Sequence, residues 1–130
     1  MDKLDQLYGL GEQVRGINKR GHIYISNCKD DPQHNEGKHS LYGAHNFLIV
    51  KGKECFGLFI DMPSQVIFDC GYSQKNLLKI TVESKNFHLY IIEEKDLLAI
   101  IKRFRELIGP SYIPPKWAFG YHQSRWGYKN

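Results

Sequence analysis

Two adjacent acidic residues before a proline, Asp30-Asp31-Pro32, are the first candidates for chemistry in this chain. Neighbouring carboxylates in an extended loop point apart, whereas a catalytic pair must face each other across a bond, roughly 5–9.5 Å apart. Two other interpretations remain open. The pair can begin a turn in which the proline fixes the backbone, or a carboxylate at a loop tip can accept hydrogen bonds from a polyhydroxylated ligand.

A second candidate region is the aromatic and polar segment WAFGYHQSRWGY at residues 117–128. It combines two tryptophans with His122 and Arg125. Aromatic side chains near a chain end can fill a hydrophobic core. Alternatively, polar and aromatic groups at the carboxyl end of a strand are typical of the active-site face of a (β/α)8 barrel.

Sequence signatures of a self-contained catalytic or metal site are absent. The chain has no GxSxG motif, and no cysteine lies in an activating setting. Its six histidines form neither an HExxH motif nor a cluster with cysteines. Gly9 and Gly11 lack the strand-to-helix context of a phosphate-binding loop. We therefore predict that this chain contains no catalytic residue, no metal site and no cofactor.

Charge and cysteine usage exclude several other classes. The net charge of +4 comes from scattered basic residues, and the densest cluster, residues 102–105, falls on a predicted helix. A solvated helix face explains this cluster, so we expect no nucleic-acid partner. Cys28, Cys55 and Cys70 are odd in number, and the apolar runs around the last two predict buried free thiols. No apolar run approaches 18 residues and no signal peptide is recognisable, so we expect no membrane partner and a cytoplasmic location.

The hydrophobic pattern predicts a mainly β protein. Alternating or apolar runs indicate five strands, at residues 45–50, 54–61, 65–70, 77–83 and 87–92. Residues 51–53 suit a tight hairpin, and the stretch 8–26 suits a loop or hairpin that feeds a short strand. Residues 27–43 are polar and predict a long loop, the kind of segment that often carries function. Antiparallel strands in this number favour a β-sandwich.

The periodicity changes after residue 93, where a helix is predicted. Leu97, Ile101, Phe104 and Ile108 fall on one apolar stripe, with acidic residues before them and Gly109 after them. After a Pro-Pro break, a last short strand is expected around residues 118–122. That strand has no partner in the rest of the chain, which the sandwich does not explain.

Three segments in register resemble one known family. These are YGLGE at 8–12, SLYGAHNF at 40–47 and PPKWAFGYHQSRWGY at 114–128. Together they closely resemble glycoside hydrolase family 31, the α-glucosidase family, from residue 8 to residue 128. In that family a β-sandwich similar to galactose mutarotase precedes a catalytic (β/α)8 barrel, and a helix and a proline break join the two.

The resemblance implies two substrate-binding residues. Family members carry an Asp on a sandwich loop, just before a Pro, that contacts the sugar being cleaved. Asp30 matches this position best, and Asp31 is the second choice because the loop length varies. Trp126 matches the aromatic residue of an Arg-aromatic-Gly-Tyr motif at the wall of the sugar pocket.

The resemblance also implies a fragment of a larger enzyme. By analogy, residues 1–92 form a partial sandwich, 93–115 the linking helix and Pro-Pro linker, and 116–130 the start of the catalytic barrel. The family's Asp nucleophile and Asp acid/base lie on later barrel segments. We therefore expect the chain alone to be inactive, and the parent to be a retaining enzyme that hydrolyses terminal α-linked glucose from α-glucoside oligosaccharides.

Other expectations follow from the same fragment hypothesis. An α-xylosidase remains open, because the family includes that activity. A free-standing, non-catalytic carbohydrate-binding sandwich is the alternative from a different class, although such a module has little reason to carry the aromatic tail. Unpaired sheet edges are templates for pairing with another chain, so we expect self-association of the fragment through those edges.

Overall fold

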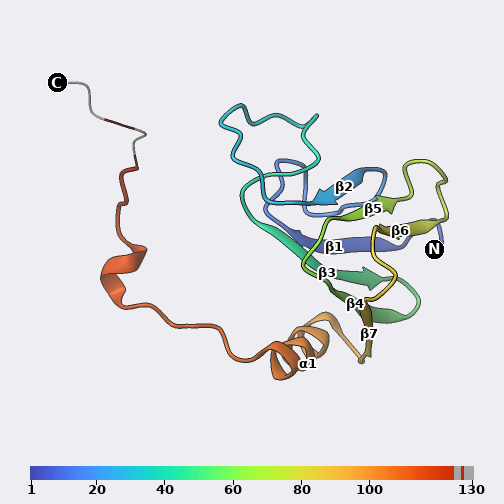
Figure 1. Ribbon diagram of the computed structural model, residues 1–130. Helices are drawn as coiled ribbons and strands as arrows, with labels where there is room; N and C mark the ends of the chain where they lie inside the picture. Colours follow the sequence, from blue (N-terminus) through green and yellow to red (C-terminus); the bar gives the residue numbers. More distant parts are fainter. Residues whose placement is uncertain (125–126, 128–130) are drawn as a thin grey trace.

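Two antiparallel sheets packed face to face form the body of the molecule (Figure 1). The computed structural model describes residues 1–124 and residue 127. Sheet A has the order β1 (Gln6–Gly11), β3 (Ala44–Lys51), β4 (Cys55–Asp61) and β7 (His88–Glu93). Sheet B has the order β2 (Ile23–Ser26), β5 (Val66–Cys70) and β6 (Leu78–Val82). The predicted mainly β antiparallel sandwich is therefore confirmed.

The main hydrophobic core lies between the two sheets. Alternate residues of each strand point into it, as the period of two along a strand requires. Leu7 and Leu48 from sheet A meet Tyr24, Val66 and Phe68 from sheet B, and all five are essentially buried. This alternation is the pattern from which the strands were predicted.

Strand β1 overlaps the start of the stretch 8–26, which the sequence marked as a loop or hairpin. It pairs with β3, with a register shift between Gly9 and Gly11. Both glycines have positive φ, +117° and +79°, and a Cβ at Gly9 would overlap the backbone carbonyl of Phe47. These glycines made the segment look like a loop in the sequence. In the fold they allow the backbones of β1 and β3 to approach closely.

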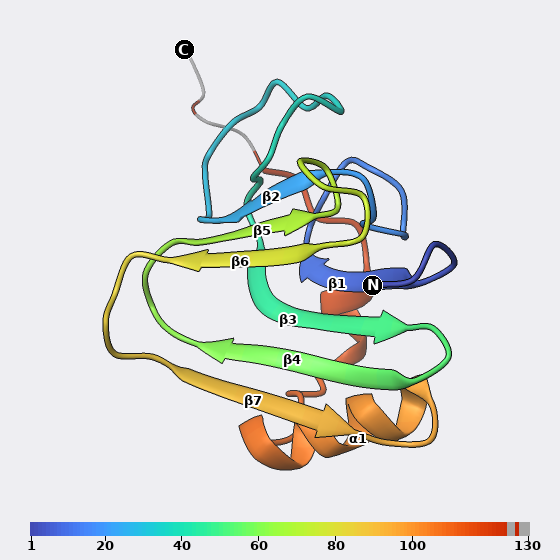
Figure 2. The ribbon, with the colours of Figure 1, turned by 90° about the vertical axis from the view of Figure 1, so that its right-hand side faces the viewer.

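The segment between β6 and β7 crosses from one sheet to the other (Figure 2). Strand β6 pairs with β5, whereas β7 pairs with β4. The two strands therefore do not form a hairpin, although only a short segment separates them. Within the described residues, β1 and β7 are the edges of sheet A, and β2 and β6 are the edges of sheet B.

Helix α1 (Leu97–Ile108) packs on the outer face of sheet A, away from sheet B. Asp96 caps its first turn by accepting the amide hydrogen of Ala99 at 2.8 Å, and Gly109 ends it. The buried side chains are Ile100 and Phe104. Ile101 and Ile108 are 40% and 51% exposed, so the predicted stripe was wrong at those two positions.

The chain leaves the sandwich after α1. Residues Lys116–Phe119 form a single 3-10 turn, η1, and residues 121–124 have no regular structure. The strand expected around 118–122 is therefore absent. A strand needs a neighbour for its backbone hydrogen bonds, and no described strand lies beside this segment. No helix in the described part of the chain is long and apolar enough to cross a membrane.

Candidate functional site

The predicted long loop forms a projecting arm, residues 27–43, between β2 and β3 (Figure 1). Its two limbs are joined near the sandwich by backbone hydrogen bonds. The amide of Ile25 donates to His39 at 2.8 Å, and the amide of Lys29 donates to Leu41 at 2.9 Å. Leu41 is 3% exposed and anchors the returning limb. The arm is therefore an ordered structure with a braced base.

The arm tip, residues 30–38, is built around Asp31. Its carboxylate forms an ion pair with Lys38 and accepts the amide hydrogen of Gln33 at 3.0 Å. The hydrogen bond from Lys38 and the backbone bond from Gln33 together lower the pKa of Asp31. Asn35 forms a second turn by accepting the amide hydrogen of Gly37 at 2.9 Å. Asp31 thus shapes the tip and is occupied within it.

Asp30 has a different environment, although it is the adjacent residue. It is exposed and forms no ion pair with any described residue. It lies beside Tyr42, where partial burial and the Asp30 carboxylate raise the pKa of the phenol. Of the two aspartates, Asp30 is therefore the one available to a ligand. The sequence placed Asp30 first and Asp31 second for the sugar contact, and that order stays a prediction.

The second predicted region, the aromatic tail, rises on the same side of the sheets as the arm (Figures 1 and 2). Trp117, Phe119 and Tyr121 are 72–89% exposed, so the described part of the tail does not fill the core. His122 is within 2.8 Å of the carbonyl oxygen of Ala118, which folds the chain back locally. Trp126 lies outside the described residues, as do Arg125 and Tyr128.

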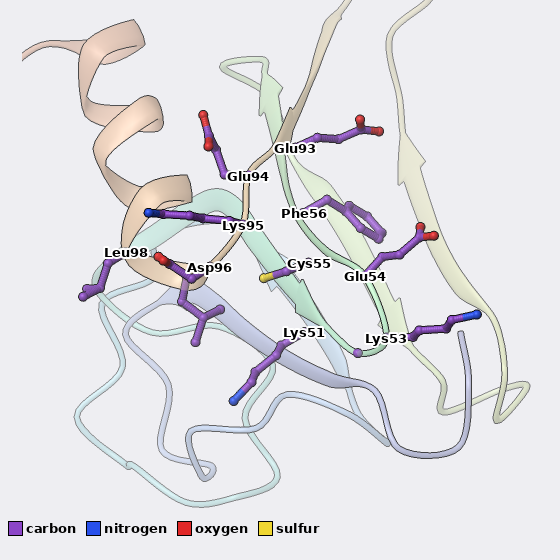
Figure 3. Close-up of a pocket in the computed structure, with 12 residues that line it drawn as sticks. Lys51, Lys53, Glu54, Cys55, Phe56, Glu93, Glu94, Lys95, Asp96 and Leu98 are labelled. Atoms are coloured by element: carbon purple, nitrogen blue, oxygen red, sulfur yellow. The ribbon is translucent and has the colours of Figure 1, made fainter.

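A broad hollow of the described surface lies elsewhere. It is an open groove of about 990 Å³ between the β3–β4 hairpin and the start of α1, at the end of β3 remote from the arm. Figure 3 shows that the charged groups of Lys51, Lys53, Glu54 and Glu93 spread apart and do not converge on one point. Among the described residues, no group of His, Cys, Asp or Glu is arranged to hold a metal ion.

Sequence reasoning missed the residues that surround and brace the arm tip. Lys38 lies seven residues after Asp31, a spacing that carries no helix or strand signal. Tyr42 lies in the SLYGAHNF segment, residues 40–47, which at the sequence level served only as evidence for the family resemblance. Arg15 belongs to the β1–β2 connection and reaches the arm only in the folded chain, by donating to the carbonyl of Glu36 at 2.6 Å.

Comparison with known proteins decides the family. The model of the glycosyl hydrolase 31 N-terminal galactose mutarotase-like domain matches residues 1–69. The chain belongs to glycoside hydrolase family 31. The motif resemblance and the galactose mutarotase-like fold are both confirmed by this match and by the relatives below.

Members of family 31 align with nearly the whole chain. An α-glucosidase from Saccharolobus solfataricus is 29% identical over 98% of this chain and 19% of its own length. Alpha-glucosidase 2 from Bacillus thermoamyloliquefaciens is 30% identical over 99% of this chain and 16% of its own length. Alpha-xylosidase 1 from Arabidopsis thaliana is 30% identical over 100% of this chain and 15% of its own length. The chain thus spans less than a fifth of these relatives.

A solved structure shows the same fold. The family 31 dextranase from Flavobacterium johnsoniae, in complex with glucose, superposes with a TM-score of 0.83 and 25% identity over 93% of this chain and 15% of its own. The same dextranase was also solved with isomaltotriose. The galactose mutarotase-like domain of family 31 is thus the architecture that carries the arm.

Proposed function

We propose that this chain is the amino-terminal part of a retaining α-glucosidase and supplies one wall of its sugar pocket. The parent enzyme hydrolyses terminal α-linked glucose from oligosaccharides, and residues 116–130 are the start of its catalytic (β/α)8 barrel. The first relatives described above are α-glucosidases, which supports glucosides over xylosides as substrates. The three free thiols fit the cytoplasmic location that we propose.

The observation that carries this proposal is that two adjacent carboxylates have different environments. Asp31 is occupied by Lys38 and Gln33, whereas Asp30 is exposed at the tip of a braced arm. A carboxylate held in this way can accept hydrogen bonds from two sugar hydroxyls without a large ordering cost. Asp30 is therefore the proposed sugar contact.

In this proposal the aromatic tail, residues 117–128, contacts the rest of the barrel and contributes to the sugar pocket. Its exposed aromatic side chains form an apolar surface of the kind that another domain covers. We propose that the barrel covers it and that Trp126 presents an aromatic face to the C–H groups of the sugar ring. Because both catalytic Asp residues would belong to the barrel, the 130-residue chain alone is expected to leave an aryl α-glucoside unhydrolysed.

The test compares Asp30→Asn with Asp31→Asn in the enzyme that contains the barrel. Loss of a charged hydrogen bond costs about 1.5–3 kcal/mol, so Asp30→Asn should raise KM for an aryl α-glucoside about 10- to 100-fold. Asp31→Asn should have a smaller effect, because it loosens the tip without removing the contact. Equal kinetics for Asp30→Asn and the native enzyme would refute the proposed contact.

Two measurements on the chain itself complete the test. Turnover of an aryl α-glucoside above a buffer control, retained through further purification, would refute the proposed inactivity. Saturable NMR shifts with maltose at physiological concentrations would instead support a free-standing carbohydrate-binding module, because one wall of a pocket binds sugar only weakly. No saturation is the expected outcome.

We also propose that the isolated chain self-associates through its sheet edges. Strand β7 has no partner on its outer side among the described strands, and its Leu89 and Ile91 are 48% and 60% exposed. Ile91→Lys should therefore reduce the mass measured by light scattering. Leu98→Lys is the matched control, because Leu98 is 78% exposed but lies on the helix. A monomer at all concentrations would contradict the proposal.

A further inference from the structure

The arm tip, residues 30–38, has few links to the rest of the domain. Its described hydrogen bonds join tip residues to one another: Lys38 and Gln33 to Asp31, and Gly37 and Lys38 to Asn35. The limbs are joined only closer to the sandwich, at residues 25–29 and 39–41. Among the described residues, one hydrogen bond leads from the tip to a residue outside the arm. It comes from Arg15.

Arg15 makes three contacts with one guanidinium group. Its Nε donates to the carbonyl oxygen of Glu36 in the tip, at 2.6 Å. Its Nη1 donates to the carbonyl oxygen of Ile23 in β2, at 3.0 Å. The group also lies 5.5 Å from the centre of the Tyr24 ring, which is 1% exposed. Arg15 therefore connects the tip to a strand that is fixed by the core.

We propose that Arg15 is a positioning residue for the sugar contact, because it ties the arm tip to β2 and so fixes where Asp30 lies. This inference rests on the function proposed above, in which Asp30 contacts the substrate. Arg15 does not touch the sugar. It acts through the backbone of Glu36, six residues along the tip from Asp30.

The geometry requires arginine at this position. The planar guanidinium offers separate N–H groups to two carbonyl oxygens and stacks against an aromatic ring at the same time. A lysine ammonium keeps the charge but cannot reproduce that fork. Arg15→Lys therefore separates the effect of the bridge from the effect of the charge, and Arg15→Met removes both.

The first experiment measures the tip in the 130-residue chain by amide hydrogen exchange. In Arg15→Met, the amides of Gly37 and Lys38 should exchange about tenfold faster, while those of Ile25 and Lys29 at the base keep their rates. Arg15→Lys should restore the tip only in part. Unchanged tip exchange in Arg15→Met would overturn the inference, whatever the sugar kinetics show.

Arg20→Met is the matched control for this experiment. Arg20 belongs to the same connection and also bonds backbone carbonyls, those of Asp2, Asp5 and Lys75, but none of these lies in the arm. It should lower overall stability without a selective change at the tip. A tip loosened equally in Arg20→Met and Arg15→Met would show a general loss of stability and overturn the positioning role.

The second experiment measures kinetics in the enzyme that contains the barrel. Arg15→Met should raise KM for an aryl α-glucoside several-fold, by less than Asp30→Asn, while Arg20→Met leaves KM unchanged. If Asp30→Asn raises KM but Arg15→Met does not, the positioning role is refuted and the sugar contact stands. If neither variant changes KM although the tip is loosened, the proposed sugar contact itself is refuted.

Discussion

The docking of α1 on sheet A can be tested by truncating two adjacent isoleucines. Ile100 is fully buried against the outer face of the sheet, whereas Ile101 is 40% exposed. The two residues have the same chemistry and the same place in the middle of the helix. Ile100→Ala and Ile101→Ala therefore differ only in the burial of the deleted carbons, and each serves as the control for the other.

The expected free energies of unfolding differ by more than the error of measurement. Each substitution removes three carbons, worth about 2.4 kcal/mol when fully buried, and a residual cavity raises the loss at Ile100 to about 3–4 kcal/mol. At Ile101 the side chain is about 60% buried, so only about 60% of the 2.4 kcal/mol for burying three carbons is lost, and no cavity forms. Alanine's better helix propensity returns about 0.4 kcal/mol there, leaving a loss of about 1 kcal/mol.

Urea unfolding followed by far-UV circular dichroism measures these losses. A domain of this size has a total stability of about 5–15 kcal/mol, so Ile100→Ala should shift the midpoint strongly and Ile101→Ala only slightly. Light scattering must show the same association state for both variants. Equal losses, or a larger loss for Ile101→Ala, would refute the helix orientation and favour the stripe that the sequence predicted.

A double-mutant cycle with Gly57 tests the same contact from the sheet. A Cβ added at Gly57 would lie 2.7 Å from Cγ2 of Ile100 and 3.1 Å from the Phe47 ring. Gly57→Ala should therefore cost about 1–3 kcal/mol by overpacking. In the Ile100→Ala background that cost should fall by about 1 kcal/mol, because the nearest atom is gone. Strict additivity would show that Gly57 and Ile100 do not meet.

Three further predictions concern other parts of the chain. Gly9→Ala should lower the free energy of unfolding by at least about 2 kcal/mol, because its Cβ would overlap the backbone of β3. Gly21 also has a positive φ but lies in open space, so Gly21→Ala should lower it by only about 1 kcal/mol. Equal losses for the two variants in urea melts would contradict this prediction. Since the folded pKa of Asp31 is lowered, its contribution to the arm is present above about pH 4 and is lost as the pH falls through the folded pKa. A carboxyl NMR titration should give a midpoint below 3.8, and one at or above 3.8 would count against the ion pair. Burial raises the pKa of Cys70 to about 12. Iodoacetamide at pH 8 should therefore modify exposed Cys28 and leave Cys70 intact until the chain unfolds. Labelling of Cys70 before unfolding would contradict this prediction.

The strands could be predicted where one face of a strand is buried and the other is not. The runs that became β3, β4 and β5 show this alternation or a continuous apolar character, and their boundaries agree with the structure within one or two residues. Strand β1 was hidden because Gly9 and Gly11 look like turn residues. Their role is to let two backbones approach, and only the position of β3 reveals that role.

Partners in space were harder to predict than elements. The segment Ser84–Asn86 looks like a hairpin turn, yet β6 and β7 belong to different sheets, since pairing depends on which apolar faces meet. In α1, periodicity alone permits a stripe through Ile101 or through Ile100. The sheet selects Ile100, because Gly57 leaves space above β4 at the point where this side chain enters.

The arm shows most clearly why a site needs tertiary structure. From the sequence, Asp30 is the first choice for a ligand contact and Asp31 the second, and only their spacing to the proline separates them. Folding brings Lys38 to Asp31, and it brings Arg15 to the backbone of Glu36. The first contact occupies one carboxylate and leaves the other exposed, and the second fixes the tip that carries both. Each depends on a residue seven or more positions away in the sequence, at a spacing that no local rule connects. Asp30 becomes a candidate ligand contact because its neighbours are bound. Variants at Asp31 and Arg15 should therefore also weaken the proposed site, by less than variants at Asp30, because they loosen the tip and leave the contact itself in place.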